Sequence, residues 1–525
     1  NPSLISNLDE HLNKINQIIE LTDDEKNFAK ENFSRLAKLN RELVLKKDLS
    51  IEERSKFEVR KYKFPNTFID QRYSRENLYP YLFSHSLGYT GNPDEFDLEE
   101  IFLNQELKPK DIIFTYSNGY LKGKTGVEYT YDSYIRGSFG KKIYEVDASG
   151  KFLNELKTID EVDGNDLFTS LDLESQKVAF EQLDNRRGAV VAVDISNGAI
   201  VTYLSSPSFS VNKIANGMTQ KEFNALLNDD DKPFFDRAAQ GRYSPASTIK
   251  PAIGLFGLEN KIIDWDFTID DPGYFILPED GRVYRGWKKG GHGNINLSNA
   301  IIESSNTFFF SLAYRSEIED LIKHLSNFGF GEIVCLDCFL PDSGLLPDPS
   351  WKMNTLDFGW FKGDTVNLGV GQGYMSATPI QLAYYASFLA NKGELNKFSF
   401  VQDNKELTKN IFSNNNINES DWFKLHDSMI GVIENPKGTA GRLRALKDYK
   451  IAAKSGTVEL VSTETKEDYK IIREVEDNRD HAIIIAFGPM PNPKYAVSVV
   501  IENGESGGSV AGPVAIEVLN ALLKQ

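Results

Sequence analysis

The sequence predicts an α+β protein with two domains, residues 1–185 and residues 186–525. A chain of 525 residues, of which 40% are hydrophobic, is too long for one ordinary core. The pattern of its first third predicts charged helices followed by short strands and turns, and the sequence becomes rich in β-forming residues after Asn185. The next run of strand candidates comes near the C-terminus, after a long and mostly helical stretch. We therefore expect the second domain to contain a central antiparallel sheet, built from both ends of the domain and flanked by helices.

The first domain begins with two helix-start signals. Thr22 with Glu25, and Ser50 with Glu53, form capping-box patterns, in which a hydroxyl and a carboxylate satisfy free backbone NH groups. Residues 110 to 170 are aromatic and punctuated by glycine, which is typical of short strands and turns.

The second domain opens with a predicted β-hairpin. In GAVVAVDISNGAIVTYLSS, two β-rich runs flank Asn197 and Gly198, the dipeptide that best accepts the positive φ angles of a tight turn. The segments YKIAAKSG, HAIIIAFG and KYAVSVVIEN are further strand candidates, and VAGPVAIEVLNALLKQ reads as a closing amphipathic helix.

Charge and hydropathy exclude two broad classes of function. The formal net charge is −17 and no basic stripe is visible, so we expect no nucleic acid partner. No stretch approaches the ~18 apolar residues of a membrane span, and the polar start NPSLISNLDE has no signal-peptide pattern. The chain as given is expected to be soluble.

The two cysteines, Cys335 and Cys338, are too few for a disulfide framework and lack the second pair of a structural zinc site. We interpret them as two half-buried strand residues, with a redox-active CxxC pair as the alternative.

The segment GRYSPASTIKP contains the first candidate for catalytic chemistry. With Ser244 as the N-cap and Pro245 as the first helical residue, Ser247 and Lys250 would lie one turn apart on the same helix face. A serine hydroxyl needs a base, and a buried lysine whose pKa is depressed can act as one. We predict that Ser247 is a nucleophile activated by Lys250.

A second element follows in IIESSNTFFF. Ser304 could relay a proton from Lys250 to a leaving amine, and the Asn306 amide could hold lysine and substrate in register. Both short patterns recur elsewhere in the chain, where we interpret them as coincidences: SxxK at Ser138 and Ser210, and SxN at Ser413 with Asn415.

The third element is AAKSGTVEL, at the end of a strand candidate. Lys454 and Ser455 could bind a substrate carboxylate, Gly456 would let a substrate backbone approach, and the Thr457 amide could complete an oxyanion hole with that of Ser247. The three patterns occur in the order expected of one active site.

A Lys-Thr-Gly triplet also occurs early, in LKGKTGVEY. It precedes every SxxK pattern, so we assign it to the non-catalytic domain. There we expect a solvated Lys124, a turn at Gly126 and a helix start supported by Glu128.

The set STIK, SSN and KSGT resembles the penicillin-binding transpeptidases. The segments DPGYFILP, YRGWKKGGHG, GDTVNLGVGQGYMSATPIQLA, NPKGTA and ENGESGGSVAGP narrow the resemblance to the class B, monofunctional penicillin-binding protein 2 family. KTGVEYTYDSYIRGSFGKKIYEVDASGK in the first domain is also similar to that family, so the resemblance covers nearly the whole chain.

The resemblance implies a pedestal domain with anchor and head subdomains, followed by a transpeptidase domain. It further implies peptidoglycan stem peptides ending in D-Ala-D-Ala as substrate, cross-linking during elongation of rod-shaped cells, and β-lactams as covalent inhibitors. The implied partners are a SEDS-family, RodA-like glycosyltransferase and an MreC-like scaffold. The implied place is the periplasmic side of the inner membrane, with an N-terminal anchor that this chain lacks. A D-Ala-D-Ala carboxypeptidase and a β-lactam-binding sensor without turnover remain as alternatives.

One departure from the family concerns metal binding. Some relatives bind zinc with two aspartates, a histidine and a cysteine, and the matching positions here are Asp271, Gly286, His292 and Ser305. Because zinc prefers four donors, we predict no metal and no other cofactor.

Overall fold

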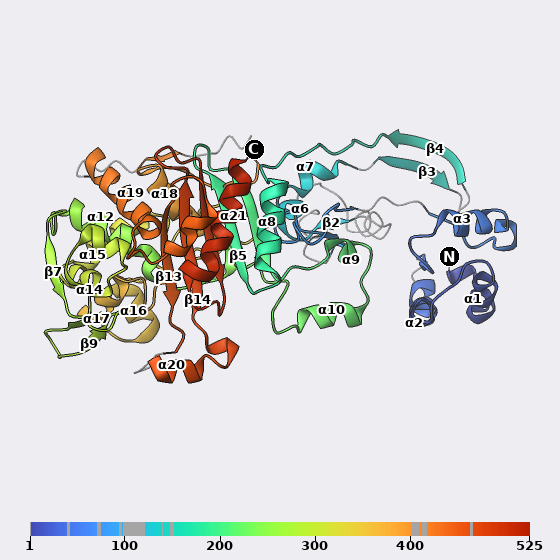
Figure 1. The fold of residues 1–525 in the computed structure, drawn as a ribbon. Helices are drawn as coiled ribbons and strands as arrows, with labels where there is room; N and C mark the ends of the chain where they lie inside the picture. Colours follow the sequence, from blue (N-terminus) through green and yellow to red (C-terminus); the bar gives the residue numbers. More distant parts are fainter. Residues whose placement is uncertain are drawn as a thin grey trace. The chain divides into compact units, whose positions relative to one another are not determined.

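The computed structural model describes residues 2–38, 42–70, 75–93, 97, 121–138, 140–146, 152–401, 409–411, 417–461 and 466–524. The chain forms two compact units, which divide between Arg75 and Glu76. Each unit is described separately below (Figure 1). Among the described residues, no helix combines the length and the apolar character needed to cross a membrane.

The first unit is a small helical assembly. Its helices are α1 (Leu8–Asn16), α2 (Asp23–Lys38) and α3 (Ile51–Glu58). Both predicted capping boxes are confirmed, because each hydroxyl accepts from the backbone NH three residues on, and each glutamate accepts in return. The apolar faces of the helices enclose a core of Leu12, Ile15, Ile19, Leu21, Ala29, Phe57 and Phe64.

The second unit is organised around a five-stranded antiparallel sheet with the order β13-β14-β15-β5-β6. The predicted sheet from both ends of the domain is therefore confirmed. Its strands are β5 (Gly188–Asp194), β6 (Ile200–Ser206), β13 (Ala452–Val458), β14 (His481–Gly488) and β15 (Tyr495–Ile501). Nearly every residue of the central strands β5, β14 and β15 is buried, because helices cover both faces of the sheet.

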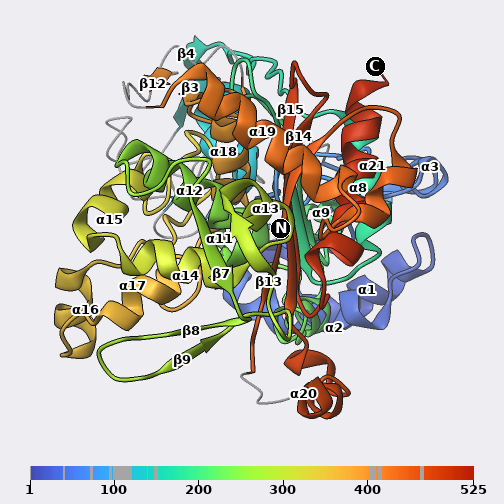
Figure 2. The same cartoon turned by 60° about the vertical axis from the view of Figure 1, so that its left-hand side comes forward.

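Two groups of helices cover the sheet (Figures 1 and 2). On one side lie α8 (Leu173–Leu183) and the predicted closing helix α21 (Gly512–Leu523), which pack against each other and against β6 and β15. Helix α18 (Pro379–Ala390), buried along its whole length, packs on β5, β14 and β15, and α19 (Glu419–Glu434) packs on β13.

The segment between β6 and β13 supplies most of the remaining elements. Its helices are α9 (Val211–Ala215), α10 (Gln220–Leu227), α11 (Arg237–Gln240), α12 (Lys250–Glu259), α13 (Leu297–Ile302), α14 (Asn306–Tyr314), α15 (Ile318–Ser326), α16 (Pro349–Leu356) and α17 (Lys362–Leu368). Its short antiparallel pairs are β7 (Thr268–Asp271) with β10 (Gly293–Asn296), β8 (Tyr274–Ile276) with β9 (Val283–Arg285), and β11 (Glu394–Asn396) with β12 (Lys409–Ile411).

The other elements of the second unit are β1 (Thr90–Gly91), β2 (Lys122–Gly123), α6 (Gly126–Thr130), α7 (Asp132–Arg136), β3 (Lys141–Val146), β4 (Phe152–Ile159) and α20 (Lys466–Ile472). These short strands and helices fit the expectation for residues 110–170 where that region is described. The predicted domain boundary at 185/186 stays a prediction, since the compact units divide elsewhere.

The hairpin prediction was right in its strands and wrong in its turn. Strands β5 and β6 pair as expected, but the connection runs from Ile195 to Ala199 and is longer than a two-residue turn. Gly198 has a positive φ of +76°, whereas Asn197 does not belong to the residues with positive φ. Gly198 is needed because a Cβ there would lie 2.7 Å from the Lys397 carbonyl oxygen.

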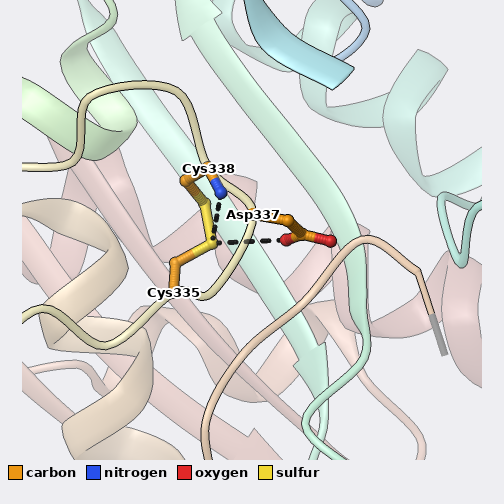
Figure 3. A group of neighbouring side chains, drawn as sticks. All are labelled: Cys335, Asp337 and Cys338. Atoms are coloured by element: carbon orange, nitrogen blue, oxygen red, sulfur yellow. Dashed lines mark hydrogen bonds between the residues drawn. A yellow bond between two sulfur atoms is a disulfide. The ribbon is translucent and has the colours of Figure 1, made fainter. Parts of the chain in front are cut away.

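The interpretation of the two cysteines as half-buried strand residues is wrong. Cys335 and Cys338 are buried, lie outside the named strands and form a disulfide (Figure 3). Asp337 lies between them, and the three side chains place potential metal ligands within 4.8 Å of one another. The disulfide leaves neither cysteine as a thiolate, the form that binds metals.

Asp337 instead accepts hydrogen bonds from two distant parts of the second unit. Its carboxylate accepts from Ser399 Oγ at 2.7 Å, from the Phe400 NH at 2.9 Å and from the Val401 NH at 3.2 Å. The Tyr131 hydroxyl, just before α7, donates to the same carboxylate at 2.9 Å. Asp337 thus joins the α6–α7 segment to the chain that follows β11.

We expect Asp337→Ala to lower the free energy of unfolding by about 2–4 kcal/mol, because it leaves several buried donors without an acceptor. Urea unfolding followed by tryptophan fluorescence, with the disulfide intact, measures the change. Asp160→Ala is a matched control, because Asp160 is exposed, and it should change stability by less than about 0.5 kcal/mol. Equal stabilities of the two variants would contradict this role.

Candidate active site

The structure brings the three predicted motifs together at the margin of the sheet (Figure 2). Ser247 lies in a 3-10 turn, Ala246–Ile249, which leads directly into α12 at Lys250. Ser304 lies between α13 and α14, and Asn306 is the first residue of α14. Lys454 to Thr457 belong to the edge strand β13, which packs against the 3-10 turn.

The backbone before the nucleophile is held in an uncommon conformation. Ala246 has a φ of +48°, in the left-handed region that costs a non-glycine residue on the order of 1 kcal/mol. Its NH donates to the Gly371 carbonyl at 2.9 Å, and the Ser244 hydroxyl donates to the same oxygen. Ser244 is therefore not the predicted N-cap, because its side chain fixes the loop that precedes Ser247.

Lys250 is fully buried and its ammonium makes three hydrogen bonds. The Nζ atom contacts the Ser304 carbonyl oxygen at 2.9 Å, Ser304 Oγ at 3.1 Å and Asn306 Oδ1 at 2.7 Å. Within the described residues, none of its hydrogen bonds reaches Ser247, although the two residues are one turn apart. The lysine is thus positioned by the second motif, close in the chain to the hydroxyl it would deprotonate.

Ser304 connects the two lysines. Lys454 Nζ lies 2.9 Å from Ser304 Oγ, on which Lys250 also converges, and donates to the Ser455 carbonyl at 3.1 Å. Ser304 has a φ of +56° and is buried. This geometry supports the predicted proton relay, since one hydroxyl can accept from one lysine while it donates to the other.

Burial explains the acid–base properties of both lysines. Burial lowers the pKa of Lys250 well below its ordinary value, and the charge on Lys454 lowers it further. Burial also lowers the pKa of Lys454, to about 7. Because the two ammonium groups repel each other, a charge on one lysine disfavours a charge on the other.

The edge strand β13 offers unpaired backbone groups beside the serine. Ser455 and Thr457 are half-buried, and Ser455 Oγ is hydrogen-bonded to Thr439 Oγ1 at 2.8 Å. A Cβ on Gly456 would lie 3.1 Å from Thr248 Cγ2 and 3.2 Å from the Pro245 carbonyl oxygen. Glycine therefore lets β13 approach the segment that carries Ser247.

The competing motifs have structural roles where they are described. Ser210 caps α9 by accepting from the Lys213 NH, and Ser138 forms an isolated bridge with Val162. Ser413 and Asn415 lie outside the described residues.

The early Lys-Thr-Gly triplet lies away from this site. Gly126 adopts a φ of +60° at the start of α6, and Glu128 lies in its first turn, as predicted. The prediction of a solvated Lys124 is wrong, because its ammonium forms an ion pair with Asp97 and its side chain is only 20% exposed.

The four positions matched to a zinc site do not fit that ion. Asp271 Oδ2 accepts from His292 Nδ1 at 2.6 Å and from Ser305 Oγ at 2.7 Å, so the two remaining donors bind each other. Gly286 supplies no side chain and Ser305 supplies a hydroxyl in place of a thiolate. This donor set falls short of the four ligands of a closed zinc site.

Two further side chains contact the site, and sequence reasoning did not single them out. Trp287 donates its indole NH to the carbonyls of Glu303 and Ser304 at 3.2 and 3.1 Å, and Thr439 contacts Ser455. Trp287 lies in YRGWKKGGHG and Thr439 in NPKGTA, and both segments carry the family resemblance. That resemblance was the signal in the sequence that could have identified these two residues.

Comparisons with known proteins agree with this geometry. The family model described as the penicillin binding protein transpeptidase domain matches residues 188–520, and the penicillin-binding protein dimerisation domain matches residues 1–169. The chain therefore belongs to the penicillin-binding transpeptidases, which are serine acyltransferases.

Three relatives narrow the family. The chain is 36% identical to the peptidoglycan D,D-transpeptidase MrdA of Acinetobacter baumannii, over 97% of this chain and 74% of that relative. The structure is similar to penicillin-binding protein 2 of Helicobacter pylori in complex with MreC, with a TM-score of 0.80, 29% identity and coverage of 99% and 92%. It is also similar to penicillin-binding protein 2 of Pseudomonas aeruginosa in complex with WCK 5153, with a TM-score of 0.73, 33% identity and coverage of 86% and 91%. Within the transpeptidases, the chain belongs to the MrdA, or penicillin-binding protein 2, family, and the predicted two-domain α+β architecture is confirmed.

We expect acylation by a β-lactam to slow as the pH rises above about 7, because Lys454 then loses the charge with which it is predicted to bind a substrate carboxylate. At lower pH the rate should also fall, because Lys250 gains a proton and can no longer act as a base. The second-order rate constant for a fluorescent penicillin, measured from pH 5 to 10, reports both limbs for the free enzyme. A rate that still rises at pH 9 would show that Lys454 need not be charged.

Proposed function

We propose that this chain is a peptidoglycan D,D-transpeptidase in which Ser247 forms the acyl-enzyme. The observation that carries the proposal is the position of Ser304 Oγ, which lies 3.1 Å from Lys250 Nζ and 2.9 Å from Lys454 Nζ. Lys250 itself is one helical turn from Ser247. This is an arrangement for moving protons within a buried site, and a serine acyl transfer needs such movements at each step.

In the acylation step, Ser247 Oγ attacks the carbonyl carbon of the penultimate D-alanine of a stem peptide. Its proton passes to the neutral Lys250 amine, and a tetrahedral oxyanion forms. The C–N bond to the terminal D-alanine then breaks, and the leaving nitrogen takes a proton delivered from Lys250 through Ser304. In the second step an amine of a neighbouring stem attacks the ester, loses its proton to the same base, and frees Ser247.

The edge strand binds the donor peptide in this mechanism. The Ser247 and Thr457 amides stabilise the oxyanion, and preorganised donors of this kind contribute about 2.7–4 kcal/mol each. Lys454 and the hydroxyls of Ser455 and Thr457 bind the terminal carboxylate, while Gly456 leaves space for the substrate backbone. Asn306, bonded to Lys250 at 2.7 Å, keeps the base in register with the bound peptide.

The same reaction accounts for inhibition by β-lactams. Ser247 would open the lactam ring, and the product stays bound as an ester because the amine that leaves remains tethered.

The partners and the cellular location are also part of the proposal. The H. pylori relative was solved in complex with MreC, and we propose an MreC-like scaffold and a RodA-like glycosyltransferase of the SEDS family as partners here. We also propose that the enzyme works on the periplasmic side of the inner membrane, where its proposed substrate lies, and that an N-terminal anchor holds it there.

We expect a fluorescent penicillin to label Ser247, detectable as a peptide adduct by mass spectrometry. Ser247→Ala should abolish the label because the nucleophile is lost, and Lys454→Ala should abolish it because the relay and the carboxylate site are both lost. Lys124→Ala is the matched control, since Lys124 belongs to the other Lys-Thr-Gly triplet, and it should retain nearly full labelling.

Labelling at Ser138 or Ser210 would contradict the assignment of the nucleophile. Incubation of the acyl-enzyme with and without an acceptor amine separates transpeptidation from the carboxypeptidase alternative, since the latter releases the acid at the same rate in both.

A further inference from the structure

A buried carboxylate lies directly behind the second catalytic motif. Asp271, the last residue of β7, is 1% exposed. Its Oδ1 accepts from the Gly273 NH at 2.7 Å, and its Oδ2 accepts from His292 Nδ1 at 2.6 Å and Ser305 Oγ at 2.7 Å. Since a carboxylate can only accept, His292 carries its proton on Nδ1.

Ser305 transmits this contact to the active site. It stands between Ser304 and Asn306, the two residues that bind Lys250, and its Oγ also caps α14 by accepting from the Phe308 NH at 3.2 Å. A capping hydroxyl can rotate between several hydrogen-bond partners. Its bond to Asp271 removes that freedom and fixes the start of α14.

Ser304 needs such support because of its backbone. A serine with a φ of +56° is in a conformation that persists only where its surroundings over-determine it. Trp287 supplies a second restraint, since its indole NH donates to the Ser304 carbonyl and its ring lies 5.9 Å from that of His292.

We propose that Asp271, oriented by His292, is a positioning residue that holds Ser304 and Asn306 against Lys250 through Ser305, without a metal ion. The inference rests on the proposed function of Ser247 and Lys250 and adds a residue to it.

The charge of Asp271 has a separate, measurable effect on the base. Burial alone would raise the pKa of Asp271, but the hydrogen bonds from Ser305 and His292 hold it below its ordinary value, so it is ionised at neutral pH. Its negative charge partly opposes the decrease in the pKa of Lys250 that burial and Lys454 cause.

Other titratable groups near Lys250 are fixed in place. Tyr385 on α18 binds the backbone of the same turn, with its hydroxyl donating to the Thr248 carbonyl at 3.1 Å. His324 on α15 bonds to the Ala252 carbonyl and to Glu259. None of these changes in the variants below.

The test compares Asp271→Asn with Asp270→Asn, its exposed neighbour on β7. The readout is the second-order rate constant of acylation by a fluorescent penicillin from pH 5 to 10, in EDTA and again with added zinc. We expect Asp271→Asn to lower the maximal rate about tenfold or more. The acid limb should also move to lower pH by on the order of half a unit, because Lys250 loses a stabilising negative neighbour. Asp270→Asn should match the unmodified protein.

Ser305→Ala separates the positioning role of Asp271 from the effect of its charge on Lys250. It also provides a second test if Asp271→Asn folds poorly. This variant removes the hydrogen bond between Ser305 and Asp271 but keeps the Asp271 carboxylate. The acylation rate should therefore fall, while the midpoint of the acid limb stays at the same pH. Unchanged rates in Asp271→Asn and Ser305→Ala would overturn the proposal, as would an unshifted acid limb in Asp271→Asn. Loss of activity in EDTA, or stoichiometric zinc in the purified protein by elemental analysis, would also overturn it.

Ser247→Ala in the same assay reports on the proposed function independently. If Ser247→Ala is still labelled, the proposed nucleophile fails, whatever Asp271 does. If only Ser247→Ala loses the label and Asp271→Asn behaves as the unmodified protein, the positioning role alone fails.

Discussion

The contact of two buried lysines with one serine hydroxyl is the constraint around which the transpeptidase fold is arranged. Lys250 and Lys454 are both 0% exposed, and both reach Ser304 Oγ. Taking two ammonium groups out of water is costly, and their mutual repulsion adds to that cost. Burial therefore lowers the pKa values of both lysines, and the loss of a proton from one of them reduces this cost. The burial that makes Lys250 and Lys454 costly to charge is therefore also what would allow one of them to act as a base in the proposed mechanism.

This contact depends on segments that are far apart in the sequence. The proposed nucleophile lies in the 3-10 turn before α12, and the proposed base is the first residue of α12. The bridging serine comes from the α13–α14 junction and the second lysine from β13. Only a rigid framework can keep three such segments within hydrogen-bond distance. The sheet provides it, because β13 is fixed by pairing with β14 along its whole length, and the strained backbones at Ala246 and Ser304 are each held by neighbouring hydrogen bonds.

The sequence was sufficient for what local patterns encode. The order of the three motifs, the capping boxes, the β5–β6 hairpin and the closing helix all depend on residues close together in the chain. The sequence was insufficient to predict the role of a side chain whose interaction partner lies far away in the chain. Ser244 was expected to cap a helix, but its hydroxyl donates to the carbonyl of Gly371. Lys124 was expected to be solvated, but it forms an ion pair with Asp97. The disulfide depended on whether a loop would bring Cys335 and Cys338 into bonding distance, which the spacing of two cysteines does not decide.

The two Lys-Gly triplets show why the letters of a motif are weak evidence without their surroundings. Lys124 has the Asp97 carboxylate beside it and forms an ion pair with it. Lys454 is fully buried and contacts two uncharged oxygen atoms, and burial lowers its pKa to about 7. The triplets Lys-Thr-Gly at 124 and Lys-Ser-Gly at 454 differ by one methyl group. The surroundings of the two lysines differ much more, because Lys124 pairs with a charged carboxylate and Lys454 contacts uncharged oxygen atoms. In the proposed mechanism, burial beside uncharged oxygen atoms lets a lysine exchange protons, and Lys454 on the edge strand β13 has such surroundings.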